Sequence, residues 1–379
     1  MKTKLVILPL ILLLAGLHGC IKEIRTVVVP SGRTVLVYMI ASNLGNMMDN
    51  NIADMIHSAT SDNLNGGNLV VFYSKNQREA ELFEIKEGAG RVVARHHIRT
   101  YEDMSAVSPE TMQRVIRDVV EMYPNKSYGM ILSGHATSWL PANVITLRAF
   151  GEENGKRMEL RELAEGLPDK RFDFLIFDAC SMAAVECVYE LRNKADYIMA
   201  SPSETMSYGI PYKTVLPFLF TEEANLEKAA ESFYLFYKND FAGAPYGNIS
   251  VVKTSELEAL ALIAGEIISG TDISVVYTPP LPDWQLLSYW AGSPTALYDF
   301  ADVIGRLATG EQYTRFNVCL NKTVIAAFAT EYTYCSGNRS TVRVNRFSGF
   351  SLYPVQSQLP LLNEWYKQLQ WSKDVYRPT

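Results

Sequence analysis

The chain has 379 residues, of which 48% are hydrophobic, 20% are charged and 11% are aromatic. This composition excludes a disordered, collagen-like or coiled-coil chain, and it is sufficient for one large hydrophobic core or two smaller ones. The 35 basic and 41 acidic residues give a formal net charge of −6 with no basic run, which argues against nucleic-acid binding and suits a cationic substrate.

The first twenty residues are predicted to be a targeting segment. Lys2 and Lys4 precede the apolar run Leu5–Leu17, which is too short to span a bilayer. The tetrapeptide LHGC at 17–20 resembles the lipobox of bacterial lipoproteins and predicts cleavage before Cys20 and acylation of that residue. The alternative is an ordinary secretory peptide that contains a cysteine. Because one acyl chain binds a membrane only weakly, several chains on Cys20 are expected to hold the protein on the bacterial cell envelope, outside the cytoplasm, with the outer membrane or cell surface favoured.

After a polar tether at 20–32, strand and helix patterns alternate along the chain. Apolar runs rich in β-branched residues predict buried strands, and apolar residues three or four apart predict helices. In chain order we expect a strand at 33–41, a helix capped by Ser42 and Asn43, a strand at 68–73, a hairpin over 79–98 that turns at 88–90, a helix from Pro109, a strand at 128–132, a helix at 160–167, a strand at 172–177, a helix at 181–194 and a strand at 195–200. Beyond about residue 245 the pattern is less regular, with a strand at 248–253 and helices near 255–268 and 297–307. This alternation predicts an α/β fold with a mostly parallel sheet and helices on both faces.

Two of the predicted strands end in residues with reactive side chains. The strand at 128–132 leads to His135, and the strand at 172–177 leads to Cys180. Ligands bind beyond the carboxyl ends of parallel strands, and about one crossover separates the two residues, so both side chains can face one crevice. A cysteine nucleophile needs a nearby base, and the start of the predicted helix at 181–194 is expected to favour the Cys180 thiolate.

Histidine is scarce, so the candidate bases can be sorted by position. His18 leaves with the targeting segment, His57 ends a helix, and His96 and His97 are neighbours in a hairpin strand. Only His135 follows an apolar strand and precedes small residues. On spacing alone, a lone cysteine and a lone histidine at strand ends are more often structural than catalytic.

Five stretches of the chain together resemble a known family. They are 34–44 (TVLVYMIASNL), 131–141 (ILSGHATSWLP), 177–184 (FDACSMAA) with its following helix, 195–212 and, more weakly, 348–354 (SGFSLYP). They are similar to the clostripain family of cysteine peptidases, which belongs to the caspase, gingipain and legumain group of folds. The resemblance implies a caspase-like three-layer α/β/α fold in which Cys180 is the nucleophile and His135 transfers the proton.

The resemblance also implies an oxyanion hole formed by the N–H groups of Cys180 and Ala136. The family usually has glycine after the catalytic histidine, where this chain has Ala136, and Ser138 stands where glycine is common. If the family glycine has a positive φ, Ala136 is strained and activity is lower. These departures keep open the alternative of a catalytically degenerate lipoprotein that binds peptides or partners at the cell envelope.

The expected substrates are peptides or proteins with a basic P1 residue. Family members cleave after Arg or Lys, and an acid two residues before the cysteine lines their S1 pocket; Asp178 occupies that position. The alternative for Asp178 is a cap on the helix expected to start near Ser181. Glu204, after the next strand, either adds charge to the same crevice or is a solvated loop acid.

Relatives of this type are often made as one chain and cut between the histidine and the cysteine. Arg148 and Arg157 flank the stretch 151–155 (GEENG), a polar loop with few prospects of burial, so self-cleavage is expected after one of them. The alternative is an uncut surface loop in an enzyme that is active as one chain.

No cofactor is expected. The histidines and acids lack metal-ligand spacing, and although clostripain-like enzymes can depend on calcium, the sequence holds no calcium-ligand loop. Cys187 shares the predicted helix with Cys180 but lies too far along it for a disulfide bond. Cys319 and Cys335 can pair, which the sequence does not decide.

The expected organisation has four parts: a lipoprotein signal peptide at 1–19, a lipidated tether at 20–32, a caspase-like peptidase core at 33–250, and a C-terminal α+β region at 251–379 packed on that core. The expected function is that of a lipid-anchored cysteine endopeptidase that hydrolyses peptide bonds after Arg or Lys.

Overall fold

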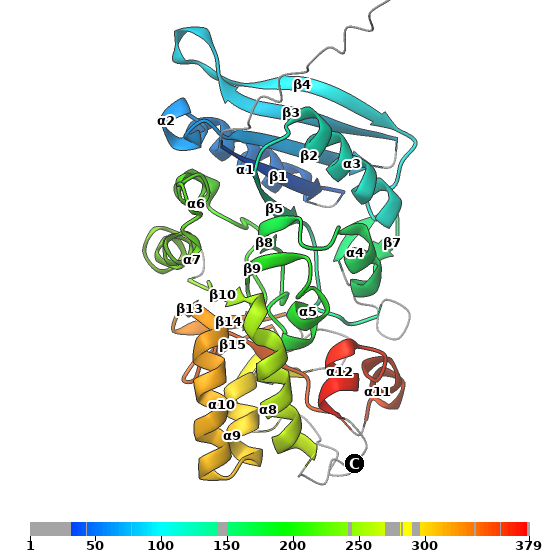
Figure 1. Ribbon diagram of the computed structural model, residues 1–379, viewed down its shortest axis with the longest axis vertical. Coiled ribbons are helices and arrows are strands. Elements are labelled where there is room, and N and C mark those ends of the chain that lie inside the picture. The colour runs from blue at the N-terminus through cyan, green and yellow to red at the C-terminus, as the bar shows by residue number, and fades with distance from the viewer. Residues whose placement is uncertain are drawn as a thin grey trace, which may run out of the picture.

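The computed structural model describes residues 32–42, 44–76, 78–141, 150–241, 245–269, 281, 283–289, 296–336, 339–356 and 358–376. A nine-stranded sheet runs through the molecule in the order β13-β10-β9-β8-β5-β1-β2-β3-β4 (Figure 1). Its five central strands are parallel: β9 (Ala195–Ala200), β8 (Phe172–Asp178), β5 (Ser127–Ser133), β1 (Arg33–Ile40) and β2 (Asn68–Asn76). The antiparallel strands β3 (Glu79–Glu87) and β4 (Val93–Glu102) complete one edge, and β10 (Ile249–Lys253) and β13 (Val324–Phe328) complete the other.

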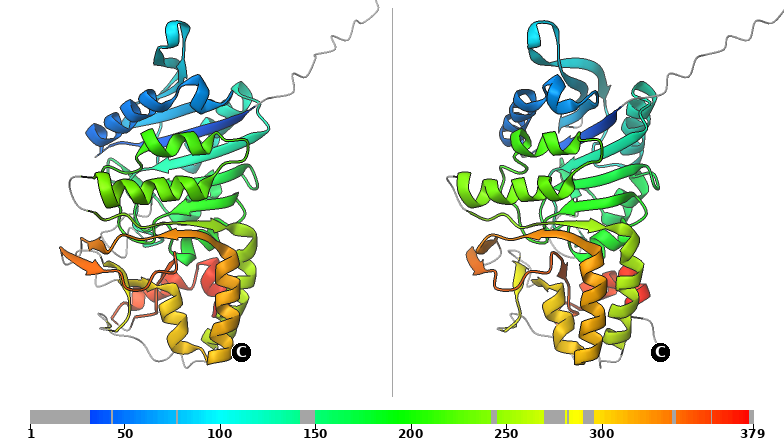
Figure 2. Two further views of the ribbon diagram at one scale, coloured as in Figure 1. Left: turned by 90° about the vertical axis from the view of Figure 1, so that its left-hand side faces the viewer. Right: turned by 60° about the vertical axis from the view of Figure 1, so that its left-hand side comes forward.

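The alternation of side chains along β1 explains why helices cover both faces of the sheet. All eight residues of β1 are buried; Leu36 and Tyr38 belong to one hydrophobic cluster, whereas Val35 and Val37 belong to another. The first cluster is completed by α3 (Pro109–Met122), α4 (Leu160–Gly166) and α5 (Val185–Glu190), and the second by α1 (Gly45–Ser58), α6 (Tyr212–Leu219) and α7 (Leu226–Leu235) (Figure 2). The predicted three-layer α/β/α architecture with a mostly parallel sheet is therefore confirmed.

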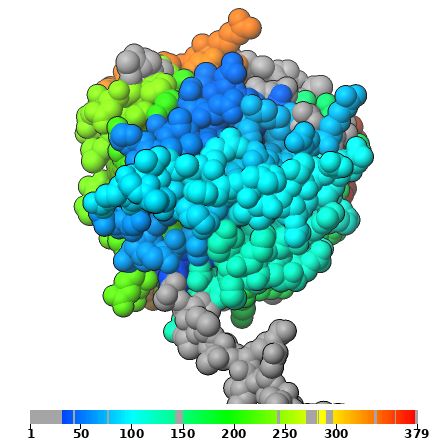
Figure 3. All heavy atoms as spheres, turned by 90° about the horizontal axis from the view of Figure 1, so that it is seen from above, coloured from blue at the N-terminus to red at the C-terminus, as the bar shows by residue number. Residues whose placement is uncertain are grey.

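The β3–β4 hairpin forms one end of the molecule and covers much of the face seen from above (Figure 3). The short helix η1 (Ala89–Arg91) lies in the turn of this hairpin, and the short helix α2 (Ser61–Leu64) precedes β2. The outer strand β4 exposes a group of cationic or titratable side chains, Arg95, His96, His97 and Arg99. Charges on an edge strand discourage pairing with another chain. Three strands separate β4 from β5, so His96 and His97 lie far from the strand that leads to His135.

The C-terminal part of the chain gathers at the β13 edge of the sheet (Figure 1). It comprises α8 (Leu257–Ser269), α9 (Phe300–Leu307), α10 (Gly310–Thr323), α11 (Pro360–Tyr366), α12 (Gln370–Val375), a three-stranded sheet of β11 (Leu286–Tyr289), β12 (Ala296–Asp299) and β16 (Ser351–Leu352), and a hairpin of β14 (Tyr332–Cys335) and β15 (Ser340–Arg343); the 3-10 turn η3 (Thr254–Glu256) precedes α8, and the π-turn η2 (Phe236–Asp240) follows α7. This part contributes β13 to the main sheet and shares one hydrophobic cluster with the strands. The division into a core and a C-terminal region at residue 250 stays a prediction.

Three local expectations differ from the structure. The helix expected at 181–194 is shorter, because α5 begins only at Val185. The helix after β1 has Leu44 at its N-cap position with no side-chain cap, so Ser42 does not cap it, and Asn43 lies outside the described residues. The stretch 151–155 is part of a hairpin of β6 (Phe150–Glu153) and β7 (Lys156–Met158). The remaining predicted elements agree with the structure to within a few residues.

No helix within the ranges given above is long and apolar enough to cross a membrane. Cys20 and the rest of the targeting segment lie outside those ranges. Cys319 and Cys335 are free thiols, so the disulfide bond that the sequence left open is not formed.

Candidate active site

The register of two parallel strands brings His135 and Cys180 to the same edge of the sheet. Ser133, the last residue of β5, lies opposite Asp178, the last residue of β8, and the Gly134 N–H donates to the Asp178 carbonyl at 3.2 Å. Each chain then runs two residues further, to His135 on one side and Cys180 on the other. Both residues line one pocket of about 240 Å³.

The Cys180 thiol is held by the loop that follows β9. The Thr205 N–H donates to Cys180 Sγ at 3.3 Å, and Thr205 Oγ1 lies 3.4 Å from the same sulfur. Burial, followed by the negative charge of Glu204, raises the pKa of Cys180 to about 11. Both causes favour the thiol over the thiolate.

The expected contribution of a helix N-terminus to the Cys180 thiolate is absent, and that prediction is wrong. Cys180 precedes a turn in which Ser181 has a φ of 57° and is fully buried. The Ser181 N–H donates to the Ser203 carbonyl at 2.9 Å, and Ser181 Oγ lies 3.0 Å from Ser288 Oγ. These contacts with distant segments hold the backbone out of a helical conformation until Val185.

In the loop after His135, the residue with a positive φ is Ser138 and not Ala136. Ala136 is buried and has a negative φ, so replacing the family glycine by alanine adds no strain at this position. Ser138 instead has a φ of 64°, and its Oγ lies 3.3 Å from the Sγ of buried Cys187. The Gly151 N–H donates to the His135 carbonyl at 2.7 Å, which ties this loop to β6.

Asp178 is a buried carboxylate at the floor of the pocket. Its oxygens accept hydrogen bonds from Ser133 Oγ at 2.9 Å, the Ile210 N–H at 2.8 Å and the Tyr212 hydroxyl at 3.1 Å. Burial raises its pKa to about 6, and these three donors oppose the rise. Asp178 forms no ion pair with any residue in the described ranges, and it does not cap α5, whose N-cap residue is Ala184.

A glycine makes room for the Asp178 carboxylate. Gly209 has a φ of 74°, and a Cβ added there would lie 2.4 Å from Asp178 Oδ1. A side chain at this position would therefore displace the carboxylate from its hydrogen-bond donors. The loop after β9 thus accommodates Asp178, the acid on which the predicted preference for a basic P1 residue depends.

Glu204 lines the same pocket and is half-buried. Its Oε1 accepts a hydrogen bond from the Ser336 N–H at 2.8 Å, just beyond β14, and burial raises its pKa. Glu204 is thus fixed by the C-terminal hairpin, and it is not the solvated loop acid that was the alternative interpretation.

Two parts of the pocket wall were not predicted from the sequence. The first is the start of α1, which contributes Met48 and Asn51; the Asn51 Nδ2 donates to the Tyr208 carbonyl at 2.9 Å. A polar Asn within the apolar stripe of that helix was the available signal. The second is Thr205, for which a threonine in an irregular loop offers no pattern.

The predicted self-cleavage positions fall differently in the structure. Arg157 lies in β7 and is half-buried, and the neighbouring Glu153 is fully buried, accepting hydrogen bonds from Ser74 Oγ at 2.8 Å and the Ala106 N–H at 2.9 Å. The expectation of a polar loop with few prospects of burial is therefore wrong for 151–153, whereas Asn154 and Gly155 are exposed at the turn. Arg148 lies outside the described residues.

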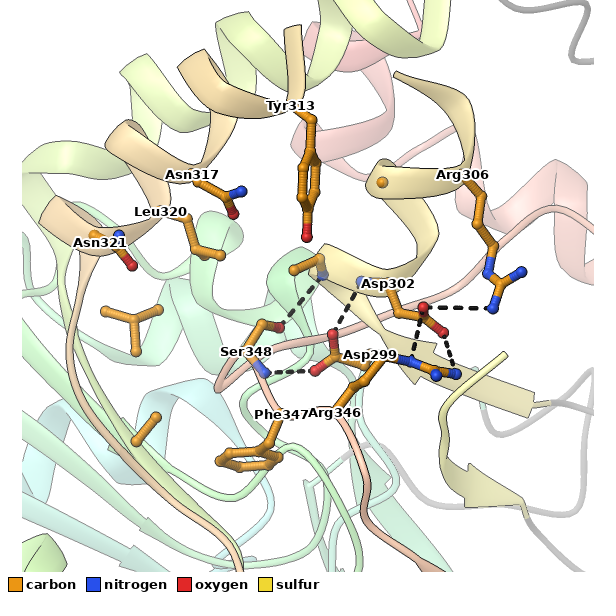
Figure 4. A pocket seen from close by; sticks show the side chains of 14 residues that line it. Asp299, Asp302, Arg306, Tyr313, Asn317, Leu320, Asn321, Arg346, Phe347 and Ser348 are labelled. Carbon is orange, nitrogen blue, oxygen red and sulfur yellow. Dashed lines mark hydrogen bonds and ion pairs between the residues drawn. The ribbon is translucent and has the colours of Figure 1, made fainter. Parts of the chain in front are cut away.

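A larger cavity of about 640 Å³ lies between α9, α10 and the segment 346–348 (Figure 4). Of its two acids, Asp302 is paired with Arg346 at 2.9 Å and Arg306 at 3.5 Å, and Asp299 accepts hydrogen bonds from the N–H groups of Ser348 and Asp302. No cysteine or histidine is among the described residues that line this cavity. Size alone therefore does not mark the reactive site. Across the described ranges, no group of three or more His, Cys, Asp or Glu side chains is placed to hold a metal ion.

Comparison with known proteins provides evidence on the family of the chain that does not depend on the pocket geometry. A model of the clostripain family, peptidase family C11, matches residues 37–376. No curated protein sequence matches the chain.

Solved structures are similar over most of the chain. An X-ray structure described as an inactive zymogen of a C11 protease from Parabacteroides distasonis is 34% identical, with a TM-score of 0.82, covering 92% of this chain and 100% of that one. A secreted C11 cysteine protease from Bacteroides thetaiotaomicron, called iotapain, is 28% identical, with a TM-score of 0.81 over 92% and 99% of the two chains. A clostripain from Bacteroides thetaiotaomicron in complex with the peptide inhibitor BTN-VLTK-AOMK is 28% identical, with a TM-score of 0.51 over 59% of this chain and 97% of that one.

Proposed function

Because the chain belongs to the clostripain family of cysteine peptidases, we propose that it is a lipid-anchored endopeptidase that cleaves after Arg or Lys through Cys180 and His135. The observation that carries the proposal is the single pocket in which His135, Cys180 and the buried acid Asp178 lie together. Within the described part of the chain, neither Lys nor Arg lines this pocket, which supports the binding of a cationic side chain of a substrate to its acids.

In the proposed reaction, Cys180 Sγ attacks the carbonyl carbon of the scissile bond. His135 accepts the thiol proton and gives it to the leaving amine, so the acyl group is held on sulfur until water releases it. The N–H groups of Cys180 and Ala136 stabilise the oxyanion. The ordinary φ of Ala136 supports this role, since the alanine does not need the left-handed conformation that favours glycine.

Asp178 is proposed to bind the P1 side chain. A guanidinium or ammonium group meets a carboxylate through charge-assisted hydrogen bonds, and burial strengthens that pairing. Since the pKa of Asp178 is about 6, the carboxylate is ionised at neutral pH. The inhibitor peptide of the Bacteroides thetaiotaomicron clostripain, VLTK, ends in lysine, which supports a basic P1 preference here.

The decisive experiment compares two fluorogenic peptides that differ only at P1, one with arginine and one with citrulline. Citrulline has the size of arginine but no charge. We expect the purified protein, residues 21–379, to hydrolyse the arginine peptide, to prefer it strongly over the citrulline peptide, and to lose activity after treatment with iodoacetamide. Equal hydrolysis of both peptides would contradict the proposed specificity, and no hydrolysis of either would favour a non-catalytic binding protein.

The lipid anchor predicts a membrane location that depends on Cys20. Replacing Cys20 by Ser removes the thiol that would be acylated, so we expect the full-length protein to move from the membrane fraction to the soluble fraction. Immunoblots of the fractions measure this, with Cys319→Ser as the matched control that should stay at the membrane. A Cys20→Ser protein that remains with the membrane would contradict acylation at Cys20.

Self-cleavage between the two catalytic residues is also proposed, and Arg148 is the favoured position. Arg157 lies in a strand whose backbone is paired, which opposes its extension into an active site, whereas cleavage after Arg148 would give a new N-terminus at Ala149. The zymogen described for the Parabacteroides distasonis relative and the raised pKa of Cys180 support a latent precursor.

N-terminal sequencing of fragments tests this prediction. We expect Ala149 as a new terminus in the wild type and in Arg157→Gln, but not in Arg148→Gln or Cys180→Ala. The same fragment in Cys180→Ala would mean that another protease makes the cut. Full activity of an intact wild-type chain would remove self-cleavage from the proposal.

A further inference from the structure

The pocket places two acids beside the nucleophile, and no lysine or arginine is among the described residues that line it. Asp178 lies at the end of β8, Glu204 lies in the loop after β9, and both line the same 240 Å³ space as Cys180. Asp178 is 8% exposed and bound by neutral donors only, and Glu204 is bound by the Ser336 N–H. The two acidic side chains give this small pocket negative charge that can attract a cation.

These acids also oppose ionisation of the thiol. Burial is the main cause of the raised pKa of Cys180, and the negative charges of Glu204 and, more weakly, Asp178 add to it. The other titratable groups around the sulfur are His135, which lines the pocket after β5, and Tyr237 in the turn after α7. A positive charge placed in the pocket would oppose the part of the rise that the acids cause.

The residue that holds the sulfur is the direct neighbour of one acid. Thr205 binds Cys180 Sγ through its N–H at 3.3 Å, and Glu204 precedes it in the loop. The carboxylate that would meet a cation and the group that fixes the thiol therefore belong to one short segment. Occupation of the pocket can act on the thiol through charge and through this loop.

We propose that a cation bound in the pocket lined by Asp178 and Glu204 activates Cys180, so that the basic P1 side chain of a substrate increases the reactivity of the nucleophile as well as binding to the enzyme. This inference rests on the proposed function, because it assumes that the P1 cation enters this pocket. It assigns to Glu204 the role of a positioning residue that couples P1 recognition to reactivity. A substrate with a neutral P1 residue then meets a thiol that is less reactive.

The test separates the cation from the rest of the substrate. The wild-type chain is treated with iodoacetamide in the presence of methylguanidinium or of N-methylurea. The wild type is used because Cys180→Ala has no thiol at this position. Methylguanidinium carries the charge of an arginine side chain, and N-methylurea has nearly its shape without the charge. In the reaction the Cys180 sulfur bonds to the acetamide carbon, iodide leaves, and the thiol proton passes to His135 or to solvent. Mass spectrometry of the peptide that contains Cys180 gives the rate at this residue alone.

We expect methylguanidinium to accelerate alkylation of Cys180 and N-methylurea to have no effect. A fall of one pKa unit gives about tenfold more thiolate near pH 7, but each thiolate is then about threefold less nucleophilic, so the net acceleration is about threefold per unit. The pH at which alkylation is half-maximal should move down by the same shift. A bound molecule that only filled the pocket would slow the reaction instead.

Removing the charge of Glu204 provides the second arm. Glu204→Gln should raise the rate of alkylation without any cation and should respond less to methylguanidinium. Glu227→Gln, which removes a negative charge from α7 at the other end of the strands, is the matched control and should behave like the wild type. Thermal unfolding of both variants checks that they are folded.

The outcomes distinguish this inference from the proposed function. If methylguanidinium competitively inhibits hydrolysis of the arginine peptide and accelerates alkylation, activation by the P1 cation is supported. If it inhibits hydrolysis but leaves alkylation unchanged or slower, the activation is overturned and the basic P1 pocket stands. If it affects neither reaction, the P1 pocket itself is wrong and the inference falls with it. Equal acceleration by N-methylurea would show that charge is not the cause and would also overturn the inference.

Discussion

Replacing Cys180 by Ala is expected to abolish peptide hydrolysis and to leave the protein folded. The thiol is the group proposed to form the acyl intermediate, so the rate should fall by about 10⁴-fold or more. The sulfur makes its hydrogen bonds with Thr205 alone among the contacts found in the described ranges, so its loss should lower the free energy of unfolding by about 1 kcal/mol. Initial rates with the arginine peptide and a urea unfolding curve measure the two quantities.

His135→Ala is expected to have a comparable effect on the rate, because the thiol then loses the group that accepts its proton. Cys187→Ala is the control for cysteine removal, since Cys187 is fully buried against Ser138 and does not line the pocket. It should retain most of the activity. Turnover that persists in Cys180→Ala and disappears in Cys187→Ala would move the nucleophile to the neighbouring helix.

The strands, and the reactive residues that follow two of them, could be predicted from the sequence because they depend on local patterns. The apolar runs of β1, β5 and β8 are continuous, as expected for strands buried on both faces, and each predicted the correct element. Parallel pairing then requires the carboxyl ends to meet at one edge. The shared pocket of His135 and Cys180 follows from these two facts without any knowledge of side-chain contacts.

The features that were missed depend on contacts between distant segments. α5 starts late because the Ser181 N–H is bound by Ser203 and its hydroxyl by Ser288. The stretch 151–155 is a hairpin because Glu153 finds its donors at Ser74 and Ala106. A periodicity along one segment carries no information about partners so far away, and buried polar residues are therefore the least predictable parts of this fold.

Asp178 shows the same limit at the site itself. An aspartate two residues before a turn suits both a helix cap and a pocket acid, and the residue type does not separate them. The structure separates them through Ile210 and Tyr212, which supply the donors that a cap would have found in α5. The proposed role of Asp178 in binding substrate is tested by substituting this residue.

Replacing Asp178 by Asn is expected to reduce kcat/KM for the arginine peptide by about 30-fold to 1,000-fold, equivalent to about 2–4 kcal/mol, because a buried guanidinium would face a neutral amide. The citrulline peptide should be affected much less. The asparagine can keep the existing contacts: its oxygen can accept from the Ile210 N–H, and the hydroxyls of Ser133 and Tyr212 can rotate to accept from its amide. A loss confined to the arginine peptide therefore reports charge rather than shape.

The same substitution should make the protein more stable at pH 8. The pKa of Asp178 rises from its ordinary value of 3.8 to about 6 on folding, so the native state holds a proton that the unfolded chain releases between these values. Wild-type stability consequently falls as the pH increases from about 4 to 6, by up to about 3 kcal/mol, whereas the asparagine side chain of the variant cannot ionise. Urea unfolding at pH 8 and pH 4 should show a difference in the free energy of unfolding in favour of Asp178→Asn that shrinks at the lower pH. Wild-type hydrolysis of the arginine peptide should decline below about pH 6 as the carboxylate is protonated.

If Asp178→Asn loses stability and hydrolyses both peptides poorly, the carboxylate only supports the loop after β9. If hydrolysis of the arginine peptide is unchanged in Asp178→Asn, Glu204 is the acid that selects the P1 cation. If Asp178→Asn is more stable and keeps its preference for arginine, the buried Asp178 has no function in substrate binding.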